Sequence, residues 1–464
     1  MKRSITLMML LLAIAMISAQ RPVQQDWLTG IGGPGQWSTN VKVAAPYVGG
    51  SFQLPVTFGA RTVLPQPGGS DCWISRVGPA GTPVWMRSFG GDRSDQIEAI
   101  ATDSEGNLYV TGTTFSARIV IDGRVLVKNG DSAGTSDAFA AKFDPFGTCL
   151  WIIAIGGTNI DVGQAIHTAA DGSIYVAGSS VGVYNNLPRW GGADALLTKL
   201  DASGAIVWQR RAGSYGNDGF TAVTTNESGQ VFVGGNFGPQ NRGNWYIGDQ
   251  VIRTFALYST EAVLASFTPA GDLLWGQTLG GPGIDTVANL LGFENDVIVT
   301  GSGYLTMKFG GITVTAGKSP DVYVVRMNEA GKGLWGARWG GSRADYPQHL
   351  ATDGEQLLVS INADCWNTAT VNYGHAVYLT LDPRTGKDIS TFRIAGEQAW
   401  AWGAMLDALS TTYIGTFQNA VSVGRNSLSA LGIQDIFVFR KHRVLANVPV
   451  DIDILPIPAI PEHK

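Results

Sequence analysis

Five aspartates recur at one place in a repeating pattern, ten residues after a tryptophan. They are Asp95, Asp161, Asp218, Asp285 and Asp345. Carboxylates gathered in a ring are suited to hold a hard cation such as Ca²⁺ or to receive a basic ligand. An aspartate in a glycine-rich turn also has a structural use, because it accepts hydrogen bonds from backbone N–H groups. A residue that most repeats need equally favours the structural use, so we predict an axial acidic ring that shapes turns and binds no metal.

A second set of candidate residues is aromatic and lies in the segments whose length varies most between repeats. Variable loops on a rigid scaffold are where binding residues concentrate. Aromatic rings there stack on sugars or anchor a protein partner. The alternative is that they only pack the loops onto the scaffold. The ligand-binding candidates are Tyr184, Trp190, Trp245, Tyr246, Tyr304, Trp366 and Tyr373.

The sequence lacks the motifs that mark common catalytic sites. Gly-x-Ser-x-Gly, His-Glu-x-x-His and the phosphate-binding loop do not occur in it. Segment 381–388 resembles the repeat of quinone-dependent dehydrogenases. However, only this copy carries Thr-Gly-Lys, and the vicinal cysteine pair typical of those enzymes is missing. We therefore predict no catalytic residues and no cofactor.

The repeat also defines the elements that hold these residues. Segment 97–102 alternates apolar and polar residues as a half-buried strand does, and 108–111 is rich in β-formers. After a variable segment, 137–143 and 150–155 are two further strands joined by a tight turn. Four short antiparallel strands of this kind make one blade of a β-propeller.

Counting these strands predicts seven blades. Fourth strands occur at six tryptophans, from Trp27 to Trp335, and a seventh at Ser390. Trp27 has no third strand ahead of it, and the third strand near Asp435 has no fourth strand after it. The simplest solution pairs the strand at Trp27 with 436–440. We predict an all-β fold, a seven-bladed β-propeller of four-stranded antiparallel blades, closed by the N-terminal strand pairing with the C-terminal blade.

Several recurring strings resemble a known family. They are Asp137-Ala-Phe-Ala-Ala-Lys-Phe-Asp, Leu274-Trp-Gly-Gln-Thr-Leu-Gly-Gly and Gly106-Asn-Leu-Tyr-Val-Thr-Gly. The chain is similar in them to the bacterial SBBP β-propeller repeat family, over roughly residues 26–442. That resemblance implies a propeller and an exported protein, and it implies no particular reaction.

The predicted blades place the remaining unusual residues. His167 and His349 fall on innermost strands three blades apart, too far to form a metal site without a third ligand. Trp37 and Trp400 stand where the aspartate is expected in the blades flanking the closure. We expect these two tryptophans to pack the seam.

Composition and termini indicate an exported chain. After Met1-Lys-Arg an apolar run, too short to span a bilayer, ends at a plausible cleavage site, so we predict a signal peptide at 1–19. The propeller is expected over 20–442 and a proline-rich tail over 443–464. Acidic residues outnumber basic ones by 37 to 32, without a basic stripe, which argues against nucleic acid. The three cysteines, Cys72, Cys149 and Cys365, occupy unrelated repeat positions and are expected to be buried thiols, although a Cys72–Cys149 bridge is conceivable.

These observations favour an exported, non-catalytic propeller. It would bind a protein or glycan of the cell envelope through its variable loop face, without a transmembrane segment. The alternative is a propeller enzyme of the lyase, glycosidase or quinoprotein type with an axial active site. That enzyme needs two carboxylates, or a histidine and a carboxylate, to converge near the axis. A passive envelope building block is the third interpretation.

Overall fold

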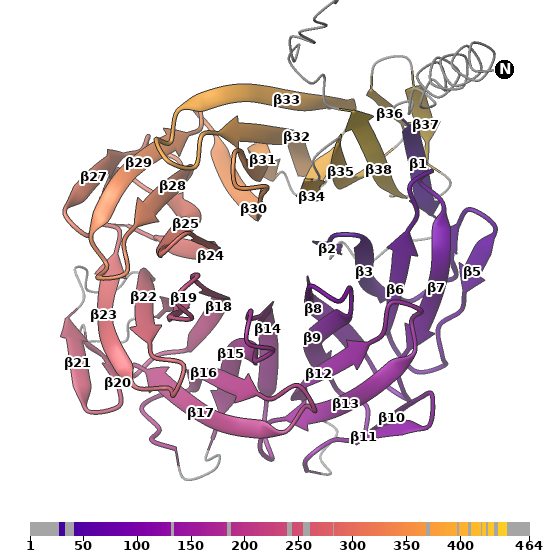
Figure 1. Cartoon of the computed structure of the whole chain (residues 1–464), viewed down its shortest axis with the longest axis horizontal. Coiled ribbons are helices and arrows are strands. Elements are labelled where there is room, and N and C mark those ends of the chain that lie inside the picture. Colours follow the sequence, from indigo (N-terminus) through magenta and orange to yellow (C-terminus); the bar gives the residue numbers. More distant parts are fainter. Residues whose placement is uncertain are drawn as a thin grey trace, which may run out of the picture.

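The chain folds into seven antiparallel blades arranged radially around a central opening (Figure 1). The computed structural model describes residues 27–32, 41–130, 134–182, 187–238, 244–253, 260–281, 283–367, 372–396, 399–406, 410–418, 420–423, 426–430 and 435–442. Within these ranges no helix is long and apolar enough to cross a membrane. The signal peptide expected at 1–19 and the tail expected at 443–464 lie outside the described residues.

Each blade has four strands, which are named below from the innermost outward. Blade 1 consists of β2 (Lys42–Ala44), β3 (Tyr47–Phe52), β6 (Asp71–Val77) and β7 (Pro83–Phe89). Blade 2 consists of β8 (Asp95–Thr102), β9 (Leu108–Thr114), β12 (Asp137–Phe143) and β13 (Cys149–Ile155). Blade 3 consists of β14 (Asp161–Thr168), β15 (Ile174–Val181), β16 (Ala193–Leu200) and β17 (Ile206–Gly213). Blade 4 consists of β18 (Asp218–Thr225), β19 (Val231–Phe237), β22 (Glu261–Phe267) and β23 (Leu273–Leu279).

The remaining three blades follow the same plan. Blade 5 consists of β24 (Thr286–Phe293), β25 (Asp296–Gly303), β28 (Asp321–Met327) and β29 (Gly333–Trp339). Blade 6 consists of β30 (Ala344–Thr352), β31 (Leu357–Asn367), β32 (Asn372–Leu381) and β33 (Asp388–Gly396). Blade 7 consists of β34 (Trp400–Leu406), β35 (Ser410–Phe417), β38 (Asp435–His442) and β1 (Trp27–Gly32).

Blade 7 is built from both ends of the described chain. β1 pairs antiparallel with β38, in a register that runs from Trp27 opposite Arg440 to Ile31 opposite Ile436. The closure predicted from the sequence is thereby confirmed, down to the segment 436–440 that receives the N-terminal strand. Without β1, β38 would be an exposed edge, which is a hazard for aggregation.

The repeated tryptophans join each blade to the next. On the outermost strand of one blade, the indole Nε1–H donates to a carbonyl in the turn between the third and fourth strands of the following blade. The six pairs are Trp27–Pro79, Trp85–Pro145, Trp151–Ala202, Trp208–Pro269, Trp275–Glu329 and Trp335–Pro383, at 2.8–3.1 Å. The same turn carries a glycine at positive φ against the indole face. A Cβ at Gly147, for example, would lie 2.9 Å from the Trp85 ring.

This contact between a tryptophan and the turn of the next blade, which we call the latch, explains why the seventh repeat has Ser390 in place of tryptophan. Ser390 lies on β33, the outermost strand of blade 6, so its partner would be the turn of blade 7. In blade 7 the third and fourth strands are β38 and β1, which come from opposite ends of the chain. No turn joins β38 directly to β1, so a tryptophan at 390 would lack the turn carbonyl that the six tryptophans use. Six tryptophans therefore match six continuous turns.

Hairpins inserted between second and third strands tie neighbouring blades together at the rim. Those of blades 1, 4 and 7 pair with the outermost strand of the preceding blade and so extend its sheet. The hairpin β4–β5 (Val56–Phe58, Arg61–Val63) pairs with β1, and β20–β21 (Asn244–Ile247, Gln250–Arg253) pairs with β17. The hairpin β36–β37 (Ala420–Val423, Asn426–Ser429) pairs with β33. The two hairpins visible in the sequence are β10–β11 (Arg118–Ile121, Arg124–Val127) and β26–β27 (Thr306–Phe309, Ile312–Thr315). They reach the preceding blade through the Arg87–Asp122 ion pair and the Gly280–Lys308 bridge.

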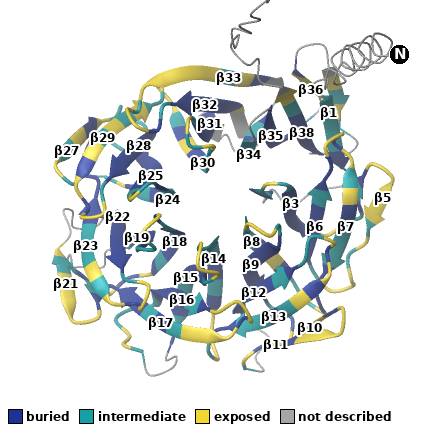
Figure 2. Cartoon of the chain, in the orientation of Figure 1, coloured by how far each residue is buried: buried dark blue, intermediate teal, exposed yellow. Residues whose placement is uncertain are grey.

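The hydrophobic core lies between the blades and is carried by their middle strands. Every residue of β9, and six of the seven in β12, is buried, whereas β13 and β17 on the rim mix buried residues with half-buried and exposed ones (Figure 2). Packing of neighbouring blades against one another through this core fixes the position of each innermost strand. The innermost strands then border the central opening.

Candidate functional site

The five repeated aspartates lie at or beside the start of innermost strands and are all buried. Each accepts a hydrogen bond from a backbone N–H four residues earlier in the preceding turn. For Asp95, Asp161, Asp285 and Asp345 the donors are Gly91, Gly157, Gly281 and Gly341, at 2.7–3.0 Å, and for Asp218 the donor is Ser214. The carboxylates point into their own turns, and this geometry shapes the passage from one blade to the next. Among the described residues there is no group of three metal-ligating side chains.

The repeat at blade 7 departs from this arrangement in a way that corrects the sequence alignment. Ala401 lies opposite Gly415 as Ile97 lies opposite Gly112, so Trp400 corresponds to Gln96. The aspartate position of blade 7 is therefore held by Ala399, one residue earlier than counting from Ser390 suggests. Trp37 lies outside the described residues.

At two junctions between consecutive blades, a repeated aspartate lies near a second buried aspartate from the third strand of the preceding blade. Asp194, at the start of a third strand, is close enough to Asp218 for its charge to raise the pKa of that carboxyl. Burial is the larger cause and raises the pKa of Asp218 to about 7, against the hydrogen bonds from Ser214 and Gly238. Burial likewise raises the pKa of Asp137 to about 6, with Asp161 adding to the rise. The carboxyl groups of Asp218 and Asp137 therefore bind protons more tightly in the folded chain than in the unfolded chain.

Raised acid pKa values predict a stability that falls as pH rises. Protonated Asp218 contributes its full stabilisation of the folded state below its unfolded pKa of 3.8. This stabilisation is lost progressively as the pH rises from there through the folded pKa of about 7. Relative to Asp218→Asn, the natural chain should therefore lose roughly 2 to 3 kcal/mol of unfolding free energy between pH 5 and pH 8. Urea unfolding of both proteins at the two pH values measures this difference.

The control for that prediction is Asp201→Asn. Asp201 lies in an exposed turn, where hydrogen bonds from Ser203 and Ala205 lower its pKa below 3.8. Its titration is complete below pH 5, so this variant should show the same pH dependence as the natural chain. A constant difference between Asp218→Asn and the natural chain across this range would contradict the prediction. His167 and His349, whose pKa values are lowered by desolvation, are present in every variant, so their opposite pH dependence cancels in the comparison.

The candidate aromatic residues are distributed between core and surface. Trp245 is fully buried in β20, packs on Phe237 at 5.1 Å between ring centroids, and is not available to a ligand. This placement corrects the expectation for Trp245. Tyr304 is half-buried beside Gly283. Tyr184 lies outside the described residues, and Trp366 and Tyr373 are described only as paired positions of β31 and β32.

Trp190 and Tyr246 come together at the surface with a third ring, Tyr215. The rings of Trp190 and Tyr246 are stacked, 6.0 Å apart and 6° from parallel, and Tyr215 meets Tyr246 edge-on at 6.5 Å. Tyr215 is 60% exposed. We call these three residues the aromatic platform. Its members come from the loop before β16, the loop between β17 and β18, and the hairpin strand β20, which β17 holds in place.

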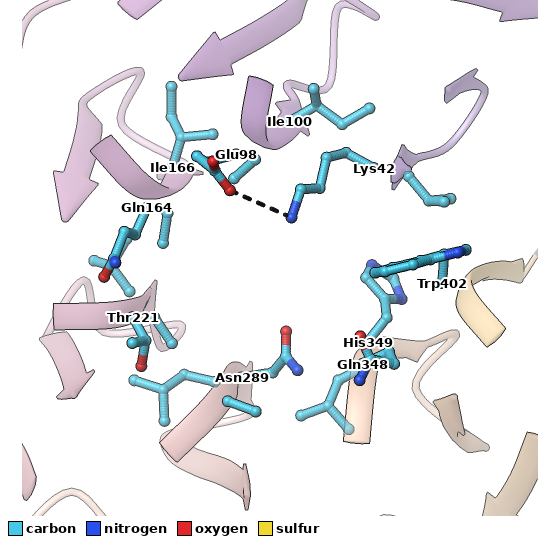
Figure 3. Close-up of a pocket in the computed structure, with 18 of the residues that line it drawn as sticks. Lys42, Glu98, Ile100, Gln164, Ile166, Thr221, Asn289, Gln348, His349 and Trp402 are labelled. Atoms are coloured by element: carbon cyan, nitrogen blue, oxygen red, sulfur yellow. Dashed lines mark ion pairs between the residues drawn. The ribbon is translucent and has the colours of Figure 1, made fainter. Parts of the chain in front are cut away.

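The central opening contains a cavity of about 260 Å³ lined by the innermost strands (Figure 3). In six blades the register between the innermost and second strands skips one residue at a β-bulge, and these residues border the cavity. They are Glu98, Gln164, Thr221, Ala288, Gln348 and Trp402. A bulge re-aims a side chain out of the regular alternation, and in each of these six blades it turns one residue toward the axis.

Charge in the cavity is limited to one ion pair. Lys42 Nζ lies 3.9 Å from Glu98 Oε2, and each side chain is about a quarter exposed. Burial lowers the pKa of Lys42, although Glu98 opposes this effect. His349 also lines the cavity, and burial lowers its pKa to about 4, so its ring is neutral at pH 7. His167, three blades away, bonds to Thr225 at 2.9 Å and does not line the cavity.

The cysteines take no part in these sites. Cys72 and Cys149 are both free and buried, so the conceivable bridge between them is not formed. Burial raises the pKa of Cys149 to about 12, which leaves its thiol protonated at neutral pH. The side chain of Cys365 lies outside the described residues.

Fold and site together define a seven-bladed β-propeller with an aromatic loop face and a polar axial cavity. A family model described as the SBBP beta-propeller repeat matches residues 73–117, which confirms the resemblance to that repeat over this segment. The matched segment begins in β6 of blade 1 and ends just beyond β9 of blade 2. One sequence repeat thus contributes the outer half of one blade and the inner half of the next.

Among curated proteins, the chain is similar to the Regulatory protein FlaEY of Caulobacter vibrioides, with 26% identity over 239 residues, 48% of this chain and 24% of that protein. It is also similar to an uncharacterized WD repeat-containing protein of Acanthamoeba polyphaga mimivirus, with 32% identity over 120 residues, 25% of this chain and 8% of that protein. The chain thus spans about a quarter or less of these relatives. The WD40 domain of Neurospora crassa Pan2 is a similar solved structure, with a TM-score of 0.41 and 11% identity, covering 74% of this chain and 88% of that one.

Proposed function

We propose that the protein is an exported, non-catalytic binding module that contacts a protein or glycan of the cell envelope through the aromatic platform. The β-propeller fold, with a regulatory protein and a WD repeat protein among its relatives, supports a binding or scaffold module in general. The observation that carries the finer proposal is the surface cluster of Trp190, Tyr215 and Tyr246, in which Tyr215 is exposed and the other two rings are half-buried. Exposed aromatic rings held by a rigid scaffold are typical anchors of an interface.

The position of the platform supports this use. Loops that lead into innermost strands and loops between second and third strands lie at the same end of antiparallel blades. The platform combines both kinds, so its rings lie on the loop face that varies between repeats. β17 and β20 pair through Ala212 with Ile247 and Gly213 with Tyr246, which preorganises the surface before a partner arrives.

Export is proposed from the N-terminal segment alone. A basic start followed by an apolar run and small residues is typical of a secretory signal peptide. N-terminal sequencing of the chain recovered from the native envelope checks this step, with Gln20 as the expected first residue.

Truncation of the platform is expected to weaken partner binding. Trp190→Ala combined with Tyr215→Ala should weaken capture of the partner about tenfold or more, because anchor residues of this kind contribute about 2 kcal/mol or more. The measurement is crosslinking from the native envelope with quantitative mass spectrometry, followed by titration of the recovered protein or glycan.

The matched control is Phe146→Ala. Phe146 is an aromatic residue, 81% exposed, in the turn between β12 and β13 at the opposite end of the blades. This variant should capture the same partner as the natural chain. If all three proteins recover identical partners in identical amounts, the platform is not the binding surface.

A further inference from the structure

The residues that border the axial cavity differ from blade to blade, whereas those that build the blades repeat. The bulged positions carry glutamate, glutamine, threonine, alanine, glutamine and tryptophan. The next position along the strand is alanine in blades 2, 3 and 4 and Gly403 in blade 7, but Asn289 in blade 5 and His349 in blade 6. Blade 1, which has no bulge in this strand, contributes Lys42 to the lining. Alanine satisfies the architecture at these positions, so the larger polar residues serve something else.

The hydrogen-bonding groups in the cavity match hydroxyl groups. Gln164, Asn289 and Gln348 each offer both a donor and an acceptor, as a hydroxyl group does. The charges of Lys42 and Glu98 offset one another across 3.9 Å. The cavity therefore selects neither an anion nor a cation, and a neutral ligand with several hydroxyl groups satisfies its lining best.

Trp402 adds a flat apolar surface to this polar ring. Its indole Nε1–H donates to Thr416 Oγ1 at 3.0 Å, which fixes the orientation of the ring. Figure 3 shows Trp402 at the edge of the opening, next to His349. The indole face suits the C–H face of a pyranose, because sugars combine an apolar face with a polar rim and aromatic side chains bind such faces.

The size of the cavity sets the size of the ligand. Its volume of about 260 Å³ lies just below the range of about 300–1,000 Å³ typical of sites for drug-sized molecules. We propose that the axial cavity is a binding site for a single neutral sugar ring, stacked on Trp402 and hydrogen-bonded by Gln164, Asn289 and Gln348. This site is separate from the aromatic platform, so each is tested without the other.

The test uses the full chain and a panel of defined sugars. Saturation-transfer difference NMR is recorded with glucose, galactose, mannose and N-acetylglucosamine at millimolar concentration, and with glucuronate and glucosamine as charged counterparts. Asn289→Ala and Gln164→Ala place in the cavity the alanine that other blades carry at the same positions, so both variants should fold. Gln96→Ala removes an exposed glutamine from β8, outside the cavity lining, and is the matched control.

We expect at least one neutral sugar to receive saturation from the natural chain and from Gln96→Ala. The same sugar should bind about tenfold more weakly to Asn289→Ala and Gln164→Ala, which corresponds to the loss of one good hydrogen bond. The proposal is overturned if no neutral sugar of the panel binds, if only the charged sugars bind, or if binding survives both cavity variants unchanged. Binding that is lost in the platform variants but kept in the cavity variants would also overturn it.

Discussion

Deletion of residues 20–31 is expected to abolish the stable propeller. The deletion removes Trp27 to Ile31, the residues of β1 that pair with β38. It also removes Ile31, which pairs with Phe58 of β4, and the Trp27 indole that donates to Pro79 of blade 1. Since the ring then opens at one seam, the loss should be comparable with the whole stability of a domain, about 5–15 kcal/mol.

Thermal and urea unfolding of the mature chain measure this effect. Deletion of residues 445–464 is the control, because the sequence predicts no blade strand there and its melting temperature should match that of the natural chain. A circular permutant that joins His442 to Trp27 through a short glycine-containing turn should also stay folded. Its new termini are placed at Gly123, an exposed hairpin tip where nothing lies within 4 Å of an added Cβ. Equal stability of the two deletions would reject the closure.

The fold was predictable because the repeat spacing leaves few choices. Strand segments, blade number and the pairing of 436–440 with the N-terminal strand all follow from one pattern read seven times. The role of the repeated tryptophan was less accessible. Within one repeat the glycine stands four residues before the tryptophan, yet Gly147 contacts Trp85 of the preceding blade. A pattern along the chain does not reveal which of its members meet in space.

The candidate site was predictable only in part, and for two physical reasons. Trp245 and Tyr246 are neighbours on β20, and alternation sends one ring into the core and the other to the surface. Deciding between them requires knowing that β20 packs on the rim. The axial cavity depends on bulges, which change the direction of a single residue in each strand. A signal existed nonetheless: 98–100, 164–166 and 348–350 are Glu-Ala-Ile, Gln-Ala-Ile and Gln-His-Leu, with a polar residue at the same repeat position.

Trp85→Ala should lower the free energy of unfolding by about 3–5 kcal/mol, the usual cost of truncating a buried tryptophan. Trp85 is only 9% exposed, packs beside Tyr47 and donates to the carbonyl of Pro145 at 2.9 Å. Trp85→Phe keeps most of the apolar contact with Gly147 and removes the donor. Its cost should be about 1 kcal/mol plus whatever packing the smaller ring loses. Urea unfolding of the two variants separates packing from hydrogen bonding.

The latch also predicts where a tryptophan brings no benefit. In the natural chain Ser390→Trp should leave stability unchanged or slightly lower, because β38 and β1 are not joined by a turn that offers a carbonyl and a glycine. In the permutant, the new turn between His442 and Trp27 supplies both groups. The same substitution should there raise the unfolding free energy, by up to the amount that Trp85→Ala removes. A gain in the natural chain, or no gain in the permutant, would show that the missing seventh tryptophan has another cause.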